Sequence, residues 1–347
     1  MDRPMTYRAG IIGCGRIAST IEDEARKFPG FFLFPYTHAG AYERHPRTSL
    51  VAAADIDEQK LCDFGQRWEV NALYTDYREM LAAEQLDIVS IAALSRLHHE
   101  MTMEVARFAV GGILLEKPVA QSLEEADEMI AACNRAGIKT VVNHVRTFDP
   151  YSRAAKGLIE GGEIGELHSA LCTWGDGLCF GGSHLFDLLR YMIGSDVAWV
   201  FCHLDDDRSS RDPGGDVYLV YKNGVRVHVH MPFPYVLSEP FVVTLIGSQG
   251  RIRMGTFEYQ WWKTVKAHGI DVVSQHPFPG RNDGFSGMYN AVDQLIGAIE
   301  RGERPVSTLE DGRAALEVIV AVLLSGQSGR PVSLPVTDTA FLAEALW

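Results

Sequence analysis

The chain has 347 residues, of which 46% are hydrophobic and 22% charged, and its 45 acidic residues outnumber 32 basic ones to give a net charge of −13. That balance excludes a nucleic-acid partner, which needs clustered Lys and Arg, and the composition excludes a disordered or fibrous protein. The length exceeds what one core usually holds, so we expect two domains.

Strands and helices alternate in the first part of the chain. Strands are expected at 8–13, 49–55, 86–92, 113–115 and 139–143, with helices at 98–110 and 123–136. Continuously apolar strands between helices indicate a parallel sheet covered on both faces, as in the doubly wound Rossmann fold. We therefore predict an α/β, NAD(P)-binding Rossmann domain over residues 1–145.

The pattern changes after Pro150. Strands are expected at 167–174, 198–204, 216–221, 225–232, 241–246 and 251–254, with helices near 151–160, 184–193, 285–301 and 311–325. Strands joined by short turns predict a large, mostly antiparallel sheet, and so an α+β domain over residues 146–347. We assign this domain to substrate binding and oligomerisation. The exposed face of such a sheet needs cover, and a homodimer or homotetramer is the usual solution.

The first predicted strand leads into GCGRIA at residues 13–18, a GxGxxA turn that opens a helix. Its two glycines permit a tight turn and a close approach of the backbone to a pyrophosphate, and the helix N-terminus supplies N–H donors. The strand before it and the helix after it favour a dinucleotide site. We predict that Gly13, Gly15, Arg16 and Ile17 bind the cofactor.

The acid expected to bind the adenosine ribose is Asp55, at the end of the second strand. Asp57 follows closely, and no arginine stands beside the pair, so two carboxylates occupy the place of the 2′-phosphate of NADP. This favours NAD as the cofactor. The preceding segment contains an aromatic-rich insertion, residues 21–37, which either serves packing or an oligomer contact or forms a flap over the cofactor or substrate.

The fourth strand stops abruptly at Glu116, Lys117 and Pro118. Ligands of a doubly wound sheet bind beyond the carboxyl ends of its strands, so Lys117 is expected to project toward the cofactor. Pro118 restricts Lys117 to an extended backbone and permits a cis peptide bond, and either would fix the direction of the side chain. A lysine held there can donate a hydrogen bond to an alcohol or carbonyl oxygen, and partial burial would bring its pKa nearer to neutrality.

Other features argue against a membrane, secretion or a metal. The N-terminal apolar stretch is too short for a signal peptide, and residues 318–324, the most apolar later segment, are too few to span a bilayer, so we expect a cytoplasmic protein. The six cysteines lack CxxC spacing, which favours buried, reduced thiols. His228 and His230 point the same way along a strand, but no carboxylate or cysteine joins them, so no metal site is predicted.

These motifs together resemble the family of glucose–fructose oxidoreductase and inositol dehydrogenase, Gfo/Idh/MocA. The matching segments run in order through almost the whole chain: GCGRIA, AAADID, SRLH at 95–98, EKP at 116–118, RTFDP at 146–150, GEIGEL at 162–167, HLFDLLRYMIG at 184–194 and SGQSGRPV at 325–332. The resemblance implies an NAD(P)-dependent oxidoreductase that acts on sugars, cyclitols or related polyols.

The resemblance also implies roles for single residues. Lys117 would hold the reacting oxygen and His184 would be the general acid or base, a role that suits the ordinary histidine pKa near 6.5. Glu116, Ser95 and His98 would lie along the nicotinamide half of the cofactor. The residues expected to bind substrate are His144, Arg146, Trp174, Asp176 and Asp187.

Two positions depart from the family pattern. Members commonly have an aspartate four residues before the catalytic histidine, where this chain has Phe180, which can neither accept a hydroxyl proton nor orient an imidazole. We hypothesise that Asp176 substitutes for it. Ala93 and Leu94 replace the usual threonine–proline after the third strand. Both departures affect the expected substrate more than the expected reaction.

Three functions are compatible with these residues. The first is an NAD-dependent dehydrogenase that moves a hydride between nicotinamide and a carbon bearing a hydroxyl. The second is a lyase or glycosidase that oxidises its substrate transiently and accumulates no NADH. The third is a dinucleotide-binding sensor without turnover, which would not need to keep both Lys117 and His184.

Overall fold

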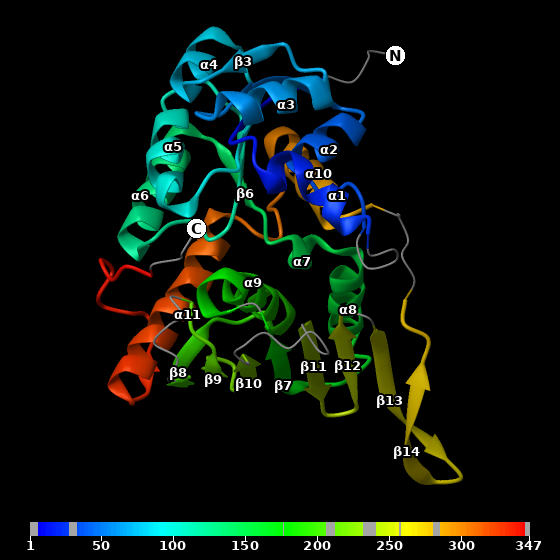
Figure 1. Ribbon diagram of the computed structural model, residues 1–347. Coiled ribbons are helices and arrows are strands. Elements are labelled where there is room, and N and C mark those ends of the chain that lie inside the picture. Colours follow the sequence, from blue (N-terminus) through cyan, green and yellow to red (C-terminus); the bar gives the residue numbers. More distant parts are fainter. Residues whose placement is uncertain are drawn as a thin grey trace. The chain divides into compact units, whose positions relative to one another are not determined.

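The computed structural model describes residues 6–27, 33–175, 177–205, 212–231, 241–256, 258–279 and 285–343. The chain divides into two compact units (Figure 1). The first contains Met1–Phe148 and Gly284–Arg313, and the second contains Asp149–Asp283 and Ala314–Leu346. Each unit is built around one sheet.

The first unit has a six-stranded parallel sheet in the order β3-β2-β1-β4-β5-β6, which confirms the predicted Rossmann fold. Its strands are β1 (Tyr7–Ile12), β2 (Thr48–Ala54), β3 (Ala72–Tyr74), β4 (Ile88–Ile91), β5 (Gly112–Leu115) and β6 (Lys139–Val142). The short strand β3 was not predicted, because three residues are too few to show a strand pattern. The strand order reverses between β1 and β4, where such sheets bind their ligands.

Several helices of this unit begin where a polar side chain caps them. They are α1 (Ile21–Ala25), α2 (His38–Arg44), α3 (Glu58–Trp68), α4 (Tyr77–Ala83), α5 (His98–Val105), α6 (Leu123–Ala136), α7 (Val145–Phe148) and α10 (Gly287–Arg301), with short turns η1 (Arg16–Thr20) and η2 (Ser95–Leu97). Asp57, Asp76 and Ser122 each accept a backbone N–H from the first turn of α3, α4 and α6. Such caps satisfy donors that a helix leaves unpaired.

Helix α10 packs with the first unit, although the predicted division at residue 145 placed it in the second domain. It lies beside α2, far away in the sequence (Figure 1), and Leu295 is buried in the core beneath the sheet. Gly112 makes room, since a Cβ atom there would lie 2.9 Å from Leu295 Cδ1 and 3.0 Å from Ile299 Cδ1. A glycine at the start of β5 therefore allows this helix to pack closely.

The second unit has a nine-stranded sheet in the order β14-β13-β12-β11-β7-β10-β9-β8-β15. Its strands are β7 (Leu167–Trp174), β8 (Val197–Leu204), β9 (Gly215–Tyr221), β10 (Arg226–Met231), β11 (Phe241–Gly247), β12 (Gly250–Gly255), β13 (Tyr259–Ala267), β14 (Ile270–His276) and β15 (Val332–Ser333). Only the β7–β10 pair is parallel in this sheet as described, which confirms the mostly antiparallel prediction.

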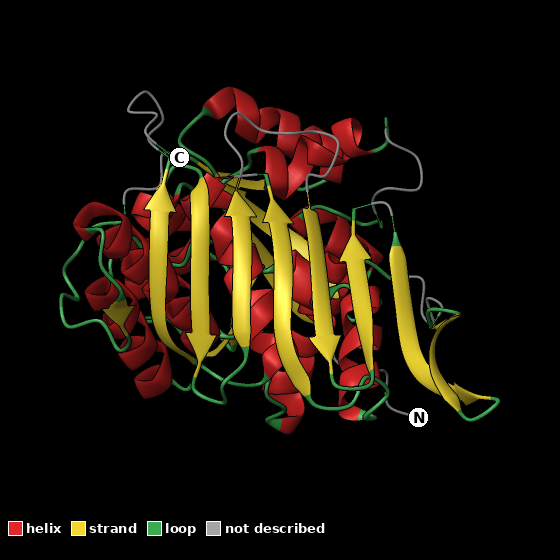
Figure 2. Ribbon diagram, turned by 90° about the horizontal axis from the view of Figure 1, so that it is seen from below, coloured by secondary structure: helices red, strands yellow, loops and turns green. Residues whose placement is uncertain are grey.

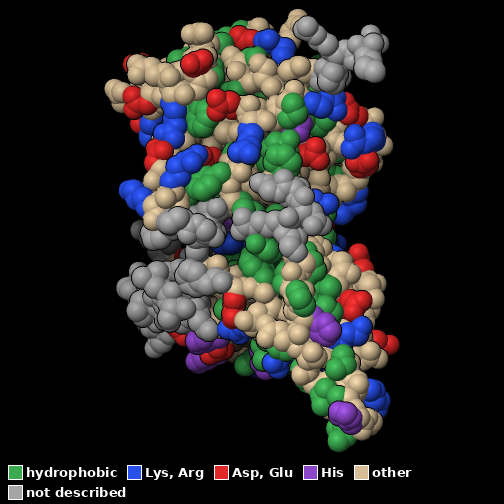
Figure 3. Space-filling model, turned by 90° about the vertical axis from the view of Figure 1, so that its right-hand side faces the viewer, with side chains coloured by type: hydrophobic (Ala, Val, Ile, Leu, Met, Phe, Trp, Pro, Cys, Tyr) green, Lys and Arg blue, Asp and Glu red, His purple; other side chains and the backbone are tan. Residues whose placement is uncertain are grey.

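The β13–β14 hairpin was missed by the sequence analysis. Its turn uses His268 and Gly269, both at positive φ (51° and 80°), as two-residue hairpins require. The strands carry no clear alternation of buried and exposed residues, and Ile270 and Val273 are exposed. Figure 3 shows hydrophobic side chains along this hairpin. A strand without a buried face lacks the period-two signal on which the prediction depended.

The two faces of the nine-stranded sheet differ. Helices lie behind one face in Figure 2, and the face toward the viewer carries no helix among the described residues. The remaining helical elements are α8 (Pro150–Glu160), η3 (Gly177–Gly181), α9 (Gly182–Ile193) and α11 (Leu309–Ser328). Along β10, residues alternate strictly between exposed and buried. The sequence prediction that His228 and His230 share a face is confirmed.

The packing of α10 gives a stability prediction. Leu295→Ala is expected to lower the free energy of unfolding by about 2–5 kcal/mol, because a fully buried leucine leaves a cavity. Urea denaturation followed by circular dichroism measures this change. Ile56→Ala, at a side chain that is 89% exposed, is the control and should change stability by no more than about 0.5 kcal/mol. Equal effects for both variants would contradict the packing described.

Candidate active site

The glycine turn after β1 has the geometry of a phosphate-binding loop. Gly13 has φ +93°, and a Cβ atom there would lie 2.8 Å from the carbonyl carbon and oxygen of Ala92, so only glycine fits. A Cβ atom at Gly15 would meet nothing within 4 Å, which leaves open space above the turn. A π-helical turn, η1, follows in place of a regular α-helix. The space at Gly15 fits the close approach of a pyrophosphate.

Asp55 closes this turn. Its carboxylate accepts the backbone N–H of Cys14 at 2.7 Å and that of Asp57 at 2.9 Å. Asp57 in turn caps α3. Arg16 pairs with Glu24, at 3.0 Å from Nε to Oε1. Burial, with the charge of Asp55, raises the pKa of Cys14 to about 12, so this thiol stays protonated at neutral pH and is no nucleophile.

Glu116 follows β5 and is a buried carboxylate with three donors. His38 Nε2 lies 2.9 Å and Asn143 Nδ2 2.5 Å from Oε1, and the backbone N–H of Lys117 lies 3.3 Å from Oε2. Burial alone would raise the pKa of Glu116, but the bonds from His38 and Asn143 and the charge of Lys117 outweigh it and lower that pKa. The carboxylate is therefore ionised at neutral pH.

Lys117 stands at the carboxyl edge of the sheet, where the prediction placed it. Its side chain is half-buried, and the Lys117–Pro118 peptide bond is cis. His98 contacts the turn that follows Lys117. Its Nδ1 lies 2.9 Å from the carbonyl oxygen of Pro118, and its Nε2 lies 3.1 Å from that of Ala93. Burial lowers the pKa of His98. Its ring is fully buried, and its predicted place beside the cofactor stays a prediction.

Two buried polar atoms at this edge have no hydrogen-bond partner among the described residues. They are Ser95 Oγ, after β4, and Asn143 Oδ1, after β6. Buried polar atoms normally have partners, so a polar ligand along this edge fits the site better than none. Ser95 was expected beside the cofactor, whereas Asn143 was not singled out in the sequence.

His144 and Arg146, expected near the substrate, follow β6. The ring of His144 is buried, and its Nδ1 lies 2.9 Å from Ser307 Oγ. Arg146 is half-buried in α7. Their contact with substrate stays a prediction.

The second unit holds the other expected site residues. His184 is half-buried in the first turn of α9, and Asp187, three residues later on the same side of the helix, is buried. Trp174 ends β7, packs edge-to-face on Phe241 at 4.6 Å, and its indole N–H is buried without a partner in the described part of the chain. Asp176 lies outside the described residues.

Asp212 was missed by the sequence analysis. Its carboxylate accepts the backbone N–H of Cys179 at 2.6 Å and that of Phe180 at 2.9 Å. Burial raises the pKa of Asp212, although these N–H donors lower it in part. Gly177 has φ +75°, and a Cβ atom there would lie 2.5 Å from Asp212 Oδ2. A carboxylate from a distant segment thus lies at the turn before His184, where Phe180 provides none.

Two models of one family match this chain. The description "Oxidoreductase family, NAD-binding Rossmann fold" matches residues 7–144, and "Oxidoreductase family, C-terminal alpha/beta domain" matches residues 173–334. The chain belongs to the Gfo/Idh/MocA oxidoreductase family. The predicted resemblance is confirmed. Most of the motifs that carried it lie in one or other matched segment, whereas RTFDP at 146–150 and GEIGEL at 162–167 lie between the two segments.

Relatives in the Gfo/Idh/MocA family have low sequence identity to this chain. An uncharacterized oxidoreductase, YrbE, of Bacillus subtilis is 30% identical over 206 residues, 55% of either chain. A D-apiose dehydrogenase of Paraburkholderia graminis is 24% identical and the match covers 94% of this chain and 90% of that one. A myo-inositol 2-dehydrogenase of Thermotoga maritima is 24% identical, with 94% and 98% covered.

Solved structures agree with the fold. An oxidoreductase from Agrobacterium radiobacter, in complex with NAD+, L-tartaric acid and magnesium, has a TM-score of 0.77 and 19% identity over 95% of this chain and 98% of that one. At this identity the likeness concerns the fold alone.

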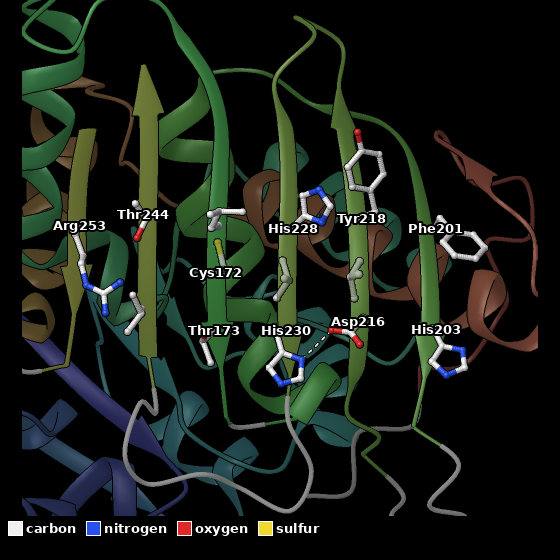
Figure 4. Close-up of a pocket in the computed structure, with 14 residues that line it drawn as sticks. Cys172, Thr173, Phe201, His203, Asp216, Tyr218, His228, His230, Thr244 and Arg253 are labelled. Carbon is white, nitrogen blue, oxygen red and sulfur yellow. Dashed lines mark hydrogen bonds and ion pairs between the residues drawn. The ribbon is translucent and has the colours of Figure 1, made fainter. Parts of the chain in front are cut away.

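A groove of about 440 Å³ lies on the open face of the nine-stranded sheet (Figure 4). Its polar lining includes His203, His228, Arg253 and the pair formed by His230 Nδ1 and Asp216 Oδ1 at 2.8 Å. The described residues contain no group of three or more His, Cys, Asp or Glu side chains that could hold a metal ion.

The remaining sequence expectations concern cysteines and membranes. All six cysteines are free, and five are buried as expected. Cys62 is exposed on α3, which corrects the expectation for that residue. In the described ranges, no helix has the length and apolar character needed to cross a membrane.

The charge of Glu116 gives a pH prediction. Because folding lowers its pKa, the ionised carboxylate adds stability above its ordinary pKa of 4.5, and this contribution is lost as the pH falls through the lowered value. Glu116→Gln should therefore be less stable than the unmodified protein at pH about 7, and the difference should narrow below pH about 4. Chemical denaturation of both proteins across this pH range measures the difference in their free energies of unfolding. A difference independent of pH would show that the carboxylate is not ionised.

Proposed function

We propose that the protein is an NAD-dependent dehydrogenase that transfers a hydride between nicotinamide and a carbon bearing a secondary hydroxyl, in a sugar, cyclitol or related polyol. The observation that carries the proposal is the shared sheet edge: the open glycine turn after β1 and Lys117 after β5 both stand at carboxyl ends of one parallel sheet. Sugar and inositol dehydrogenases among the relatives support the substrate class.

The preference for NAD rests on Asp55. Its carboxylate lies against the backbone N–H of Cys14 at the phosphate turn, and Asp57 stands close by. A 2′-phosphate near this position would meet negative charge, whereas a ribose hydroxyl could donate a hydrogen bond to a carboxylate oxygen. The nearby Arg16 is already paired with Glu24.

In the proposed reaction, one residue stabilises charge and another transfers the proton. Bound NAD supplies the hydride acceptor. Lys117 donates a hydrogen bond to the substrate hydroxyl and stabilises the negative charge that develops on its oxygen, while His184 takes the hydroxyl proton as the C=O bond forms. In the reverse direction, Lys117 polarises the carbonyl and His184 returns the proton. The residues expected to position the substrate are His144, Arg146, Trp174, Asp176 and Asp187.

A second function is proposed because Phe180 stands where family members commonly have an aspartate. This position offers no carboxylate side chain to bind a polyol hydroxyl, and a lyase or glycosidase with transient oxidation would use the same Lys117 and His184. Such an enzyme releases product without net NADH. Net NADH formation therefore separates the two functions.

We also propose that the protein self-associates through the open face of the nine-stranded sheet. Leu171 and Phe201 on this face are 50% and 39% exposed, which is unusual for large apolar side chains on a sheet. Leu171 lies on β7, the central strand of the nine. A two-fold axis that lies outside the sheet, in front of this face, would bring the same surface of two copies together, as an isologous dimer requires.

Activity of Lys117→Ala tests the dehydrogenase. With NAD and a pool of sugars, cyclitols and polyols, the unmodified protein should form NADH, and Lys117→Ala should lose about 10²–10⁴-fold in kcat. Lys139→Ala is the matched control, because Lys139 is exposed at the opposite end of the same sheet. An active Lys117→Ala variant would refute the role of Lys117. An unmodified protein that binds NAD but forms no NADH would refute the dehydrogenase.

Light scattering after size-exclusion chromatography tests the interface. Leu171→Glu should convert the assembly to monomers, since a charge buried between two sheets costs several kcal/mol. Leu342→Glu, at another exposed apolar residue, should leave the assembly unchanged. A monomeric unmodified protein, or a Leu171→Glu variant that still associates, would contradict the proposed surface.

A further inference from the structure

The two ends of the insertion at residues 21–37 meet at a buried carboxylate. Glu22, in α1, accepts the backbone N–H of Tyr36 at 2.6 Å, and both the N–H and the hydroxyl of Thr37 at 3.1 Å. Thr37 also caps α2 by accepting the N–H of Gly40. One side chain therefore joins the two ends of the insertion and fixes where α2 begins. The first residue of α2 is His38.

His38 is fully buried, and both of its ring nitrogens have partners. Nε2 lies 2.9 Å from Glu116 Oε1, and Nδ1 lies 2.9 Å from Ser90 Oγ. Ser90 Oγ in turn lies 2.7 Å from the hydroxyl of Tyr42, one turn along α2. Tyr42 and Ser90 are fully buried as well. Because an ionised carboxylate only accepts, Nε2 carries a proton and donates a hydrogen bond to Glu116.

This hydrogen-bond network ends at the Glu116 carboxylate, which contacts the backbone of Lys117. Glu116 Oε1 takes the bonds from His38 and Asn143, and Oε2 takes the N–H of Lys117 itself. The titratable groups near the carboxylate are His38 from α2, Lys117 from the turn after β5 and His98 from α5. Electrostatic coupling is mutual, so a negative Glu116 also favours the charged ammonium form of Lys117. Loss of the His38 bond would make the ionised form of Glu116 less favourable, and it would free the carboxylate to rotate.

We propose that His38 is a positioning residue: it holds the Glu116 carboxylate behind Lys117, so that the ammonium group is charged and correctly directed for the substrate oxygen. The proposal rests on the proposed dehydrogenase function. It also gives the insertion a role, because Glu22 closes the insertion at the start of α2 and so sets the place of His38. Sequence patterns alone assigned His38 no function.

Three variants separate positioning from packing. His38→Leu fills the space but removes the N–H donor to Glu116, whereas His38→Gln retains a side-chain N–H of similar reach. Tyr42→Phe removes only the hydroxyl at the far end of the network. We expect His38→Leu to lose about 10²-fold in kcat, with His38→Gln recovering much of this loss and Tyr42→Phe close to the unmodified protein. NAD affinity should change little in all three.

Amine labelling gives a readout that does not need turnover. Only the neutral amine of lysine reacts with acetic anhydride, so the labelling rate of Lys117 at fixed pH, measured by peptide mass spectrometry, reports its charge. In His38→Leu the rate should rise about tenfold, the ratio that corresponds to one pKa unit. His38→Gln should change it less, and Lys139 serves as the internal reference. The pH profile of kcat in the direction of carbonyl reduction should move to lower pH in parallel.

The outcomes distinguish this proposal from the proposed function. Unchanged Lys117 labelling in a folded His38→Leu variant would overturn the positioning role. Equal loss of kcat in His38→Leu and His38→Gln, without a shift in the pH profile, would overturn it as well. Faster labelling in His38→Leu, with no dehydrogenase activity in the unmodified protein, would support the role of His38 toward Lys117 and refute the dehydrogenase.

Discussion

The buried charge of Glu116 is the constraint on which the candidate site of the first unit depends. A carboxylate removed from water stays ionised only when N–H donors surround it. Its donors come from α2, from the residue after β6 and from the second residue after β5, so that satisfying one charge holds three segments at one edge of the sheet. This arrangement also fixes the position of the Lys117 backbone, because its N–H is one of the donors.

Carboxylates hold other turns in the same way. Asp55 accepts from Cys14 at the glycine turn, Glu22 accepts from Tyr36 and Thr37 at the end of the insertion, and Asp212 accepts from Cys179 and Phe180 before His184. Charge-assisted bonds of this kind are stronger than neutral ones and restrict loops that packing alone leaves loose. Part of the acidic excess of the chain therefore shapes its loops as well as its surface.

Local patterns predicted the parallel sheet, the glycine turn and the place of Lys117, because strand period, turn residues and sequence order determine them. They predicted the helix at 285–301, but not that it packs in the first unit, because its apolar stripe meets its partner only in the folded chain. They missed the β13–β14 hairpin, which lacks a buried face, and they missed His38 and Asp212. The contacts of these two residues join segments far apart in the sequence, which no spacing rule records. A family motif marked His98 for the cofactor. Its ring nitrogens lie at two backbone carbonyls, and its role toward the cofactor stays a prediction.

The most direct test of the dehydrogenase is the fate of the hydrogen on the substrate carbon. Sugars and cyclitols deuterated at their carbinol carbons are incubated with the protein and NAD, and the nicotinamide product is analysed by mass spectrometry. The account predicts NADH that carries deuterium at C4, in amounts that grow with the oxidised product. Product formation without deuterated NADH would contradict net hydride transfer to the cofactor and would favour the transient-oxidation alternative.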